Sequence, residues 1–184
     1  MIDTKKLVKE FNNLDKGAIV LIETTAETIL EVHLIAVKWL SKKNYVQIIL
    51  STSRPCKNLL SLYKERGIDI SKLMILCTCC QEKEKDKQEN NNIIHLSSSS
   101  SLTEMSLSLS KCTESIKDEK FIFIDSITTM LIHNNPNTLA KFIHSILTKM
   151  RINNVSGLLI SSEAETDKEV IAEITQLCDK VIKV

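Results

Sequence analysis

The sequence contains very little glycine and proline, with three glycines and two prolines among 184 residues. Average usage would be about 7% glycine and about 5% proline, so few backbone positions can adopt a positive φ without strain. Gly17, Gly67 and Gly157 lie far apart, and no two of them fit G-x-x-x-x-G-K-[ST] or G-x-G-x-x-G. Those motifs bring a bare backbone against phosphate groups. The sequence therefore excludes a standard phosphate-binding loop.

An excess of charge of one sign and a long apolar run are also missing. The 24 basic residues nearly balance the 23 acidic ones, giving a net charge of +1, so a dedicated nucleic-acid binder is not expected. No apolar run approaches the roughly 18 residues that a membrane span needs, and the start at 1–6 leads into no apolar signal-peptide core. We therefore expect a cytoplasmic protein with no membrane partner, whose six cysteines are reduced.

Strand and helix patterns alternate along most of the chain. Short apolar runs rich in β-branched residues predict strands, at 18–22, 45–50, 73–77, 121–125, 155–161 and 180–184. Apolar residues at spacings of three and four predict helices between them, at 27–43, 55–66, 102–116, 136–150 and 167–178. A further helical stretch is expected directly after the strand 121–125. This order is typical of βαβ units. It predicts an α/β fold, a doubly wound and mostly parallel β-sheet flanked by helices, as a single domain over 1–184.

Two polar segments follow the third predicted strand. The segment 81–92 is charged and rich in asparagine, so we expect a mobile loop there. The serine run 97–101 ends at a helix start, where Ser101 and Glu104 fit the capping box S-x-x-E.

Chemistry in an open α/β sheet is expected at the carboxyl ends of the strands, where such sheets bind their ligands. Polar residues follow five of the predicted strands, and they are Glu23 to Thr25, Ser51 to Arg54, Cys77 to Cys80, Asp125 with Ser126, and Ser161 to Glu163.

Three segments together resemble the RecA superfamily, in particular the archaeal ATPases similar to the circadian-clock ATPase KaiC. The segment 121–126, Phe-Ile-Phe-Ile-Asp-Ser, resembles the Walker B strand of that family, and 51–69 resembles the segment after its second strand. Cys178 to Ile182 resembles its entry into the last strand. The resemblance covers about residues 15 to 184. It implies a RecA-like fold, with Asp125 as the residue that would organise Mg²⁺.

The same comparison reveals two departures from the family pattern. The phosphate loop of the family should lie between Leu21 and Glu31, where this sequence has neither glycine nor lysine. The catalytic glutamate should follow the second strand, where 52–54 reads Thr-Ser-Arg. We therefore expect a pseudo-ATPase that serves as a binding or regulatory module and requires no cofactor. Its vestigial nucleotide pocket would be lined by Thr24, Thr25, Asp125 and Ser161.

Three alternatives remain open at this point. Residual binding of ATP and Mg²⁺, or an atypical ATPase, would use the hydroxyls of Thr24 and Thr25 with Arg54, and the metal would bind Asp125. A DNA accessory role, as in recombinase paralogues of the superfamily, would depend on the few lysines at 38, 42 and 43. A structural role in a ring or filament would require self-association. The expected partner is a protein or a second copy of the chain.

Two weaker signals have plain structural interpretations. Cys77 and Cys80 form C-x-x-C, but neither a second such pair nor a helical pattern follows, so we interpret them as small residues at a strand end. His33 and His144 lie in predicted helices without H-x-x-x-H spacing, and His133 lies near a helix end. We interpret these histidines as surface or packing residues rather than ligands.

Overall fold

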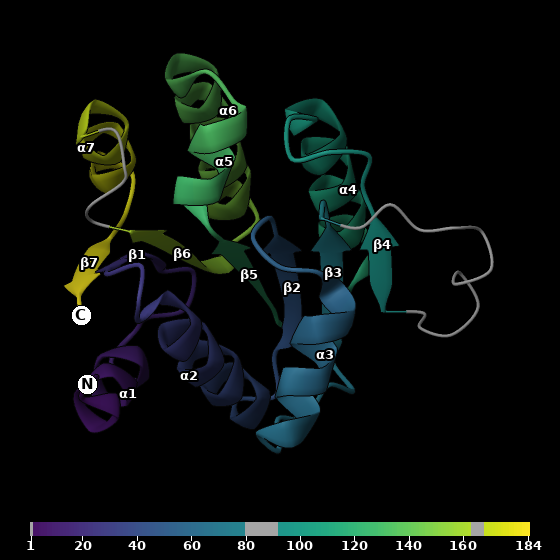
Figure 1. The fold of residues 1–184 in the computed structure, drawn as a ribbon, viewed down its shortest axis with the longest axis vertical. Coiled ribbons are helices and arrows are strands. Elements are labelled where there is room, and N and C mark those ends of the chain that lie inside the picture. The colour runs from purple at the N-terminus through teal and green to yellow at the C-terminus, as the bar shows by residue number, and fades with distance from the viewer. Residues whose placement is uncertain (1, 80–91, 163–167) are drawn as a thin grey trace.

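A computed structural model describes residues 2–79, 92–162 and 168–184 of the chain. A single sheet of seven strands runs through the molecule, with helices on both of its faces (Figure 1). All neighbouring strands are parallel. No helix in these residues is long and apolar enough to cross a membrane.

The elements alternate as the sequence predicts. The strands are β1 (Ile19–Thr24), β2 (Val46–Ser51), β3 (Leu73–Cys77), β4 (Ile93–His95), β5 (Lys120–Asp125), β6 (Ser156–Ser162) and β7 (Lys180–Lys183). The helices are α1 (Thr4–Asn12), α2 (Ile29–Lys42), α3 (Cys56–Glu65), α4 (Leu102–Ser115), α5 (Ile127–His133), α6 (Pro136–Ile152) and α7 (Lys168–Gln176).

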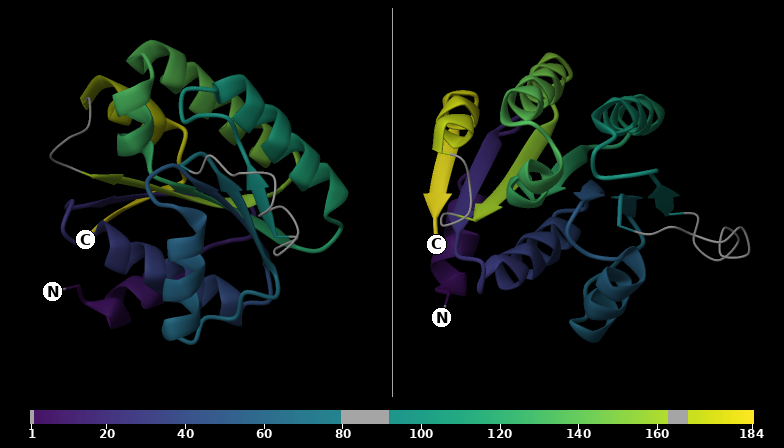
Figure 2. Two further views of the ribbon diagram at one scale, coloured as in Figure 1. Left: turned by 45° about the vertical axis from the view of Figure 1, so that its right-hand side comes forward. Right: turned by 45° about the horizontal axis from the view of Figure 1, so that its top comes forward.

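The strand order is β4-β3-β2-β5-β6-β1-β7. The chain runs from β2 through β3 to one edge at β4, and from β5 through β6 to the other edge at β7, with β1 between β6 and β7. Helices α1 to α3 cover one face and α4 to α7 the other (Figure 2). Side chains alternate between the two faces along each strand. On β5, Phe121 and Phe123 belong to the core under α1 to α3, whereas Ile122 and Ile124 belong to the core under α4 to α7. The central strands are buried on both sides, which explains their continuous apolar sequence.

The predicted α/β class is confirmed, but helix α1 was not predicted. Asp3 caps this helix by accepting a hydrogen bond from the backbone N–H of Lys6 at 3.0 Å. Leu7 and Phe11, one turn apart, are buried, and the ring of Phe11 lies 5.2 Å from that of Trp39 on α2. The helix has only two buried apolar positions and begins with polar residues, so its apolar content was too low for a prediction.

Helix α4 begins where the sequence predicts, but not through the predicted capping box. Ser101 occupies the N-cap position without a side-chain capping bond. Glu104 instead accepts hydrogen bonds from the backbone N–H and the hydroxyl of Ser97, and these bonds lower the pKa of its carboxyl group. The serine run folds back toward the helix, so Glu104 bonds mainly to the first serine of the run, Ser97. The predicted mobile loop at 81–92 lies outside the described residues, apart from residue 92.

The expectation that all six cysteines are reduced is wrong, because Cys56 and Cys77 form a disulfide with Cα atoms 6.2 Å apart. Pairing of β2 with β3 sets Cys77 opposite Ser51. The chain then turns from Ser51 into α3, whose first residue is Cys56, so the two cysteines meet at one end of the sheet.

Burial raises the pKa of Cys178 to about 12. The remaining member of the C-x-x-C motif, Cys80, lies outside the described residues.

Candidate functional site

A cleft of about 270 Å³ opens at the carboxyl ends of the central strands. Three chain segments form most of it: the start of α2, the connection after β2, and the end of β5 with α5. Its lining residues are Ala26, Ile29, Leu30, Ser53, Arg54, Asp125, Ser126, Thr128, Thr129, Ile132 and Ser162. The cleft therefore lies where an open α/β sheet is expected to bind a ligand.

Asp125, at the end of β5, lies at the bottom of this cleft and is 4% exposed. Its Oδ2 atom is 2.8 Å from Nδ1 of His33 on α2. That oxygen lies off the line of the N–H bond, so the contact has the length of an ion pair but not the alignment of a hydrogen bond. Ser53 also donates its hydroxyl to Oδ2 at 3.3 Å. The imidazole of His33 and the hydroxyl of Ser53 thus both contact the same carboxylate oxygen of Asp125.

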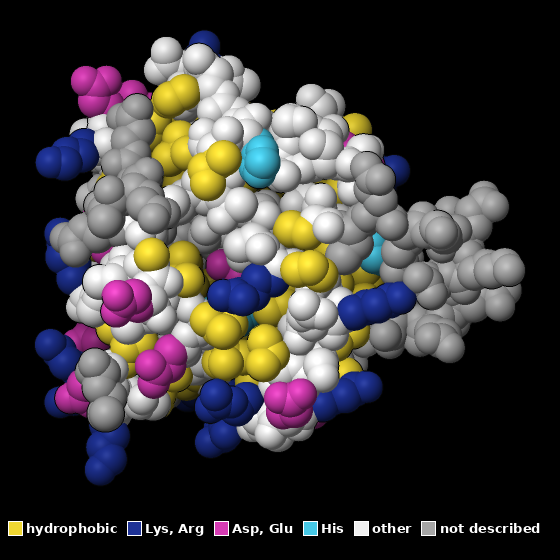
Figure 3. Space-filling model, viewed as in Figure 1, with side chains coloured by type: hydrophobic (Ala, Val, Ile, Leu, Met, Phe, Trp, Pro, Cys, Tyr) yellow, Lys and Arg dark blue, Asp and Glu magenta, His cyan; other side chains and the backbone are white. Residues whose placement is uncertain are grey.

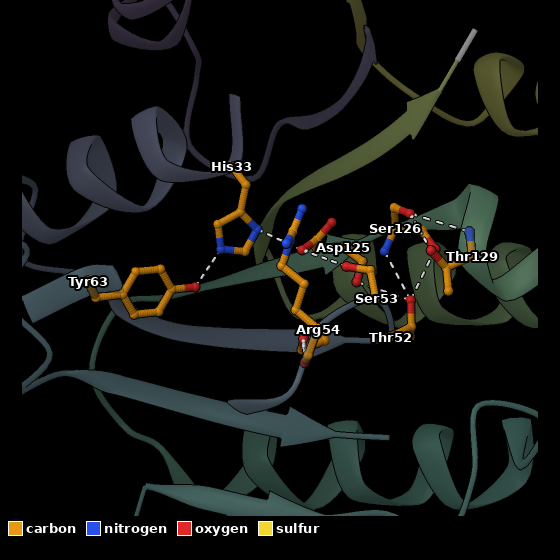
Figure 4. Close-up of polar contacts among 9 residues, drawn as sticks. His33, Thr52, Ser53, Arg54, Tyr63, Asp125, Ser126 and Thr129 are labelled. Atoms are coloured by element: carbon orange, nitrogen blue, oxygen red, sulfur yellow. Dashed lines mark hydrogen bonds and ion pairs between the residues drawn. The ribbon is translucent and has the colours of Figure 1, made fainter. Parts of the chain in front are cut away.

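The other ring nitrogen of His33 extends the contact into the core (Figure 4). Nε2 lies 2.5 Å from the hydroxyl of Tyr63 on α3, and both side chains are buried. Burial, followed by the negative charge of Asp125, raises the pKa of Tyr63 well above its usual value. The phenol therefore keeps its proton. Tyr63, His33 and Asp125 form a continuous polar row from the α3 side of the core to the cleft.

This row predicts a loss of stability at alkaline pH. The unfolded chain releases the Tyr63 proton near pH 10 whereas the folded chain retains it, so unfolding is favoured as pH rises above that value, by up to about 1.4 kcal/mol per pH unit. We expect urea unfolding between pH 9 and pH 11 to show this slope, and Tyr63→Phe to reduce it. Tyr45→Phe, at a half-exposed tyrosine, is the control, and an equal reduction in both variants would contradict the prediction.

Thr52 fixes the backbone around Asp125. Its N–H donates to the carbonyl of Asp125 at 2.8 Å, and its hydroxyl lies 3.1 Å from that carbonyl and 3.2 Å from the carbonyl of Ser126. The N–H of Ser126 donates back to the threonine oxygen at 3.0 Å, and the Asp125–Ser126 peptide bond is cis. Ser126 then caps α5 by accepting from the N–H of Thr129. The cleft floor is thus held by bonds between the ends of β2 and β5.

In the loop between β1 and α2, the hydroxyl groups of three threonines bond to one another. The hydroxyl of Thr28 lies 2.7 Å from those of both Thr24 and Thr25. The carbonyl of Thr25 accepts from the N–H groups of Thr28 and Ile29, each at 3.1 Å. The three threonine hydroxyls therefore bond to one another within the loop.

The four residues predicted to line a pocket lie at three places. Asp125 lines the cleft. Thr24 is fully buried at the end of β1, and Thr25 is exposed beside a second groove, formed with α1 and β7. Ser161 is buried on β6, with its hydroxyl 3.4 Å from that of Thr128. Among the residues described, no three side chains of His, Cys, Asp or Glu gather where they could hold a metal ion.

A family model matches residues 40–184, and its description is a family of unknown function, DUF7504. The chain belongs to this family. The matched residues include Tyr63 and Asp125 of the DUF7504 protein, whereas His33 and the threonine loop precede them. No curated protein has a matching sequence.

Solved structures resemble this DUF7504 protein over nearly its whole length. The KaiC-like protein PH0186 of Pyrococcus horikoshii has a TM-score of 0.65 at 13% identity, over 92% of this chain and 72% of that one. PH0321 of the same organism, an uncharacterized protein in complex with an unknown peptide, has 0.72 at 15%, over 97% and 82%. The flagellar accessory protein FlaH of Methanocaldococcus jannaschii has 0.60 at 13%, over 100% and 78%. The predicted RecA-like α/β fold is confirmed.

His33 and Tyr63 were not predicted as parts of the site. The sequence places His33 among the apolar residues of α2, and the structure confirms that it is a buried residue. One signal was present: a polar side chain between Val32 and Leu34, on the face that also carries Ala36 and Leu40, needs a buried partner. The sequence offers no means of choosing that partner, since Tyr63 and Asp125 lie on other elements.

Proposed function

We propose that this protein is a pseudo-ATPase, a RecA-fold protein without ATP hydrolysis that acts in the cytoplasm as a protein-binding or regulatory module. The observation that carries the proposal is the contact of His33 with Asp125, 2.8 Å long and buried. In the family that the sequence resembles, this aspartate organises Mg²⁺. Here an imidazole from α2 and the hydroxyl of Ser53 occupy the oxygen that faces the core.

The loop before α2 supports the same proposal. A triphosphate needs an open set of backbone N–H groups and a cation to neutralise the β- and γ-phosphates. Residues 22–28 contain no lysine, arginine or glycine, Glu27 is exposed there, and the threonine hydroxyls bond to one another. These residues do not suit a triphosphate, so we propose that the protein requires neither ATP nor Mg²⁺.

A protein ligand fits the fold better than a nucleotide. The structure of PH0321, which shares this fold, holds an unknown peptide. The cleft itself combines apolar and hydroxyl side chains with one guanidinium, that of Arg54, and Ile132 beside it is 72% exposed. We therefore propose a protein partner.

Calorimetric titration with Mg-ATP and a phosphate-release assay test this function. We expect no saturable heat in the millimolar range and no phosphate release above the buffer rate. Asp125→Asn is the matched variant, because it removes the charge that a metal would require and preserves the shape of the side chain. Saturable binding with phosphate release, lost in Asp125→Asn, would show a working nucleotide site and overturn the proposal.

A further inference from the structure

The outward side of α2 and the turn before it carry two adjacent rows of side chains spaced four residues apart. One row is Glu27, Glu31 and Ile35, and the other is Leu30, Leu34 and Lys38. All six line a shallow groove of about 450 Å³, which is completed by Thr4 of α1 and by Arg66 and Ile68 beyond α3. Rows of this spacing are the ridges between which a second helix packs.

The middle of this groove is apolar. Leu30 and Ile35 are half-buried, and Leu34 and Ile68 form its floor at 8% and 5% exposure. Leu30 also lines the cleft beside Asp125, so the groove along α2 adjoins the cleft at the carboxyl ends of the central strands. Figure 3 shows hydrophobic side chains gathered on this face between charged ones. The middle of the groove is therefore an apolar surface, and no helix among the described residues covers it.

Opposite charges lie at different positions along the groove. Glu27 and Glu31 are exposed near the start of α2. Lys38 and Arg66 are exposed toward its end, where Nζ of Lys38 donates to the carbonyl of Arg66 at 3.2 Å. Glu31 and Lys38 are seven residues apart, about two helical turns or roughly 10 Å. A ligand lying along α2 would thus meet negative charge first and positive charge about two turns later.

We propose that this groove binds an amphipathic helix of a partner protein. The apolar ridge of that helix fits between the two rows of α2, and its flanks carry basic residues opposite Glu27 and Glu31 and acidic residues opposite Lys38 and Arg66. A helix fits better than an extended strand, because the groove lies between helical ridges and away from either edge strand. This inference rests on the proposed function as a protein-binding module.

Three designed helical peptides of about 18 residues, or five turns, provide the probes. The matched peptide has a leucine ridge with lysines on its flank near one end and glutamates near the other. The second has the same ridge with glutamates at both positions, and the third has the matched composition with the ridge scrambled. We expect fluorescence anisotropy to give the matched peptide a Kd about tenfold lower than that of either other peptide.

Two groove variants and one control show where the matched peptide binds. Leu30→Asp should weaken its binding about tenfold, whereas Ile152→Asp, at an exposed residue on the opposite helical layer, should not. Glu31→Lys changes an exposed side chain and preserves the core, and it should shift preference to the all-glutamate peptide. Circular dichroism checks that each variant is folded.

Three results would overturn the inference. One is equal binding of all three peptides, and another is matched-peptide binding unaffected by both Leu30→Asp and Glu31→Lys. The third is a dimer in sedimentation that Leu30→Asp abolishes, which would assign the groove to a second copy. Loss of this inference leaves the nucleotide assays untouched, and phosphate release would overturn the proposed function while peptide binding still held.

Discussion

Replacement of His33 by alanine should lower the free energy of unfolding by about 3–5 kcal/mol, because it removes the imidazole that faces the buried carboxylate of Asp125. It also leaves the hydroxyl of Tyr63 without the imidazole nitrogen. Urea unfolding followed by the fluorescence of Trp39, the one tryptophan in the sequence, measures this change.

Second variants separate the buried contact from a general loss of packing. Asp125→Asn added to His33→Ala should recover part of the lost stability, since the uncompensated charge is gone. His144→Ala, at an exposed histidine on α6, should change the free energy of unfolding by less than about 0.5 kcal/mol. A loss of under about 1 kcal/mol in His33→Ala, or no recovery in the double variant, would contradict the role given to the pair.

The core of the sheet was readable from the sequence because each central strand is buried on both faces. The strand 73–77 was predicted with its observed bounds. The end of β1 was placed two residues early, at Ile22, because Glu23 and Thr24 are polar. Both residues continue the strand by pairing with Ser161 and Ser162 of β6. Local pattern therefore located the strands, while their ends depend on neighbours that the pattern does not contain.

The two elements that the sequence did not predict are short and have few buried apolar residues. Strand β4 has three residues, of which Ile94 is exposed, and it exists through its pairing with Cys77 and its neighbours on β3. Helix α1 depends on Phe11 packing against Trp39. Both elements are stabilised mainly by tertiary contacts, so the local sequence pattern does not predict them.

The candidate site was predictable in position but not in its contacts. Asp125 follows from a rule about parallel sheets, since the strand 121–125 ends in an acid. The contact with His33 required the packing of α2 against β5, and that with Tyr63 required the placement of α3 beside α2. A sequence pattern can name residues at the end of one element, but a row that crosses three elements is set by the fold.

Phe123→Ala should also cost about 3–5 kcal/mol, the usual range for a fully buried phenylalanine, and it probes the same region from the sheet. Phe123 lies in the middle of β5, paired with Ile49 of β2 and Leu158 of β6. Its ring centroid is 5.0 Å from that of His33. Truncation leaves a cavity that strands paired on both sides cannot close. Phe123→Leu should cost about 1 kcal/mol.

The effect of Phe123→Ala should depend on His33, because the phenylalanine ring holds the imidazole against Asp125. In a double-mutant cycle with His33→Ala, measured by urea unfolding, we expect a coupling energy of at least about 0.5 kcal/mol. The second substitution then costs less than it does alone, since the polar row is already broken. Leu107→Ala, at a residue 58% exposed on α4, is the control and should show no coupling. Strict additivity of Phe123→Ala and His33→Ala would mean that the ring fills space without positioning the imidazole.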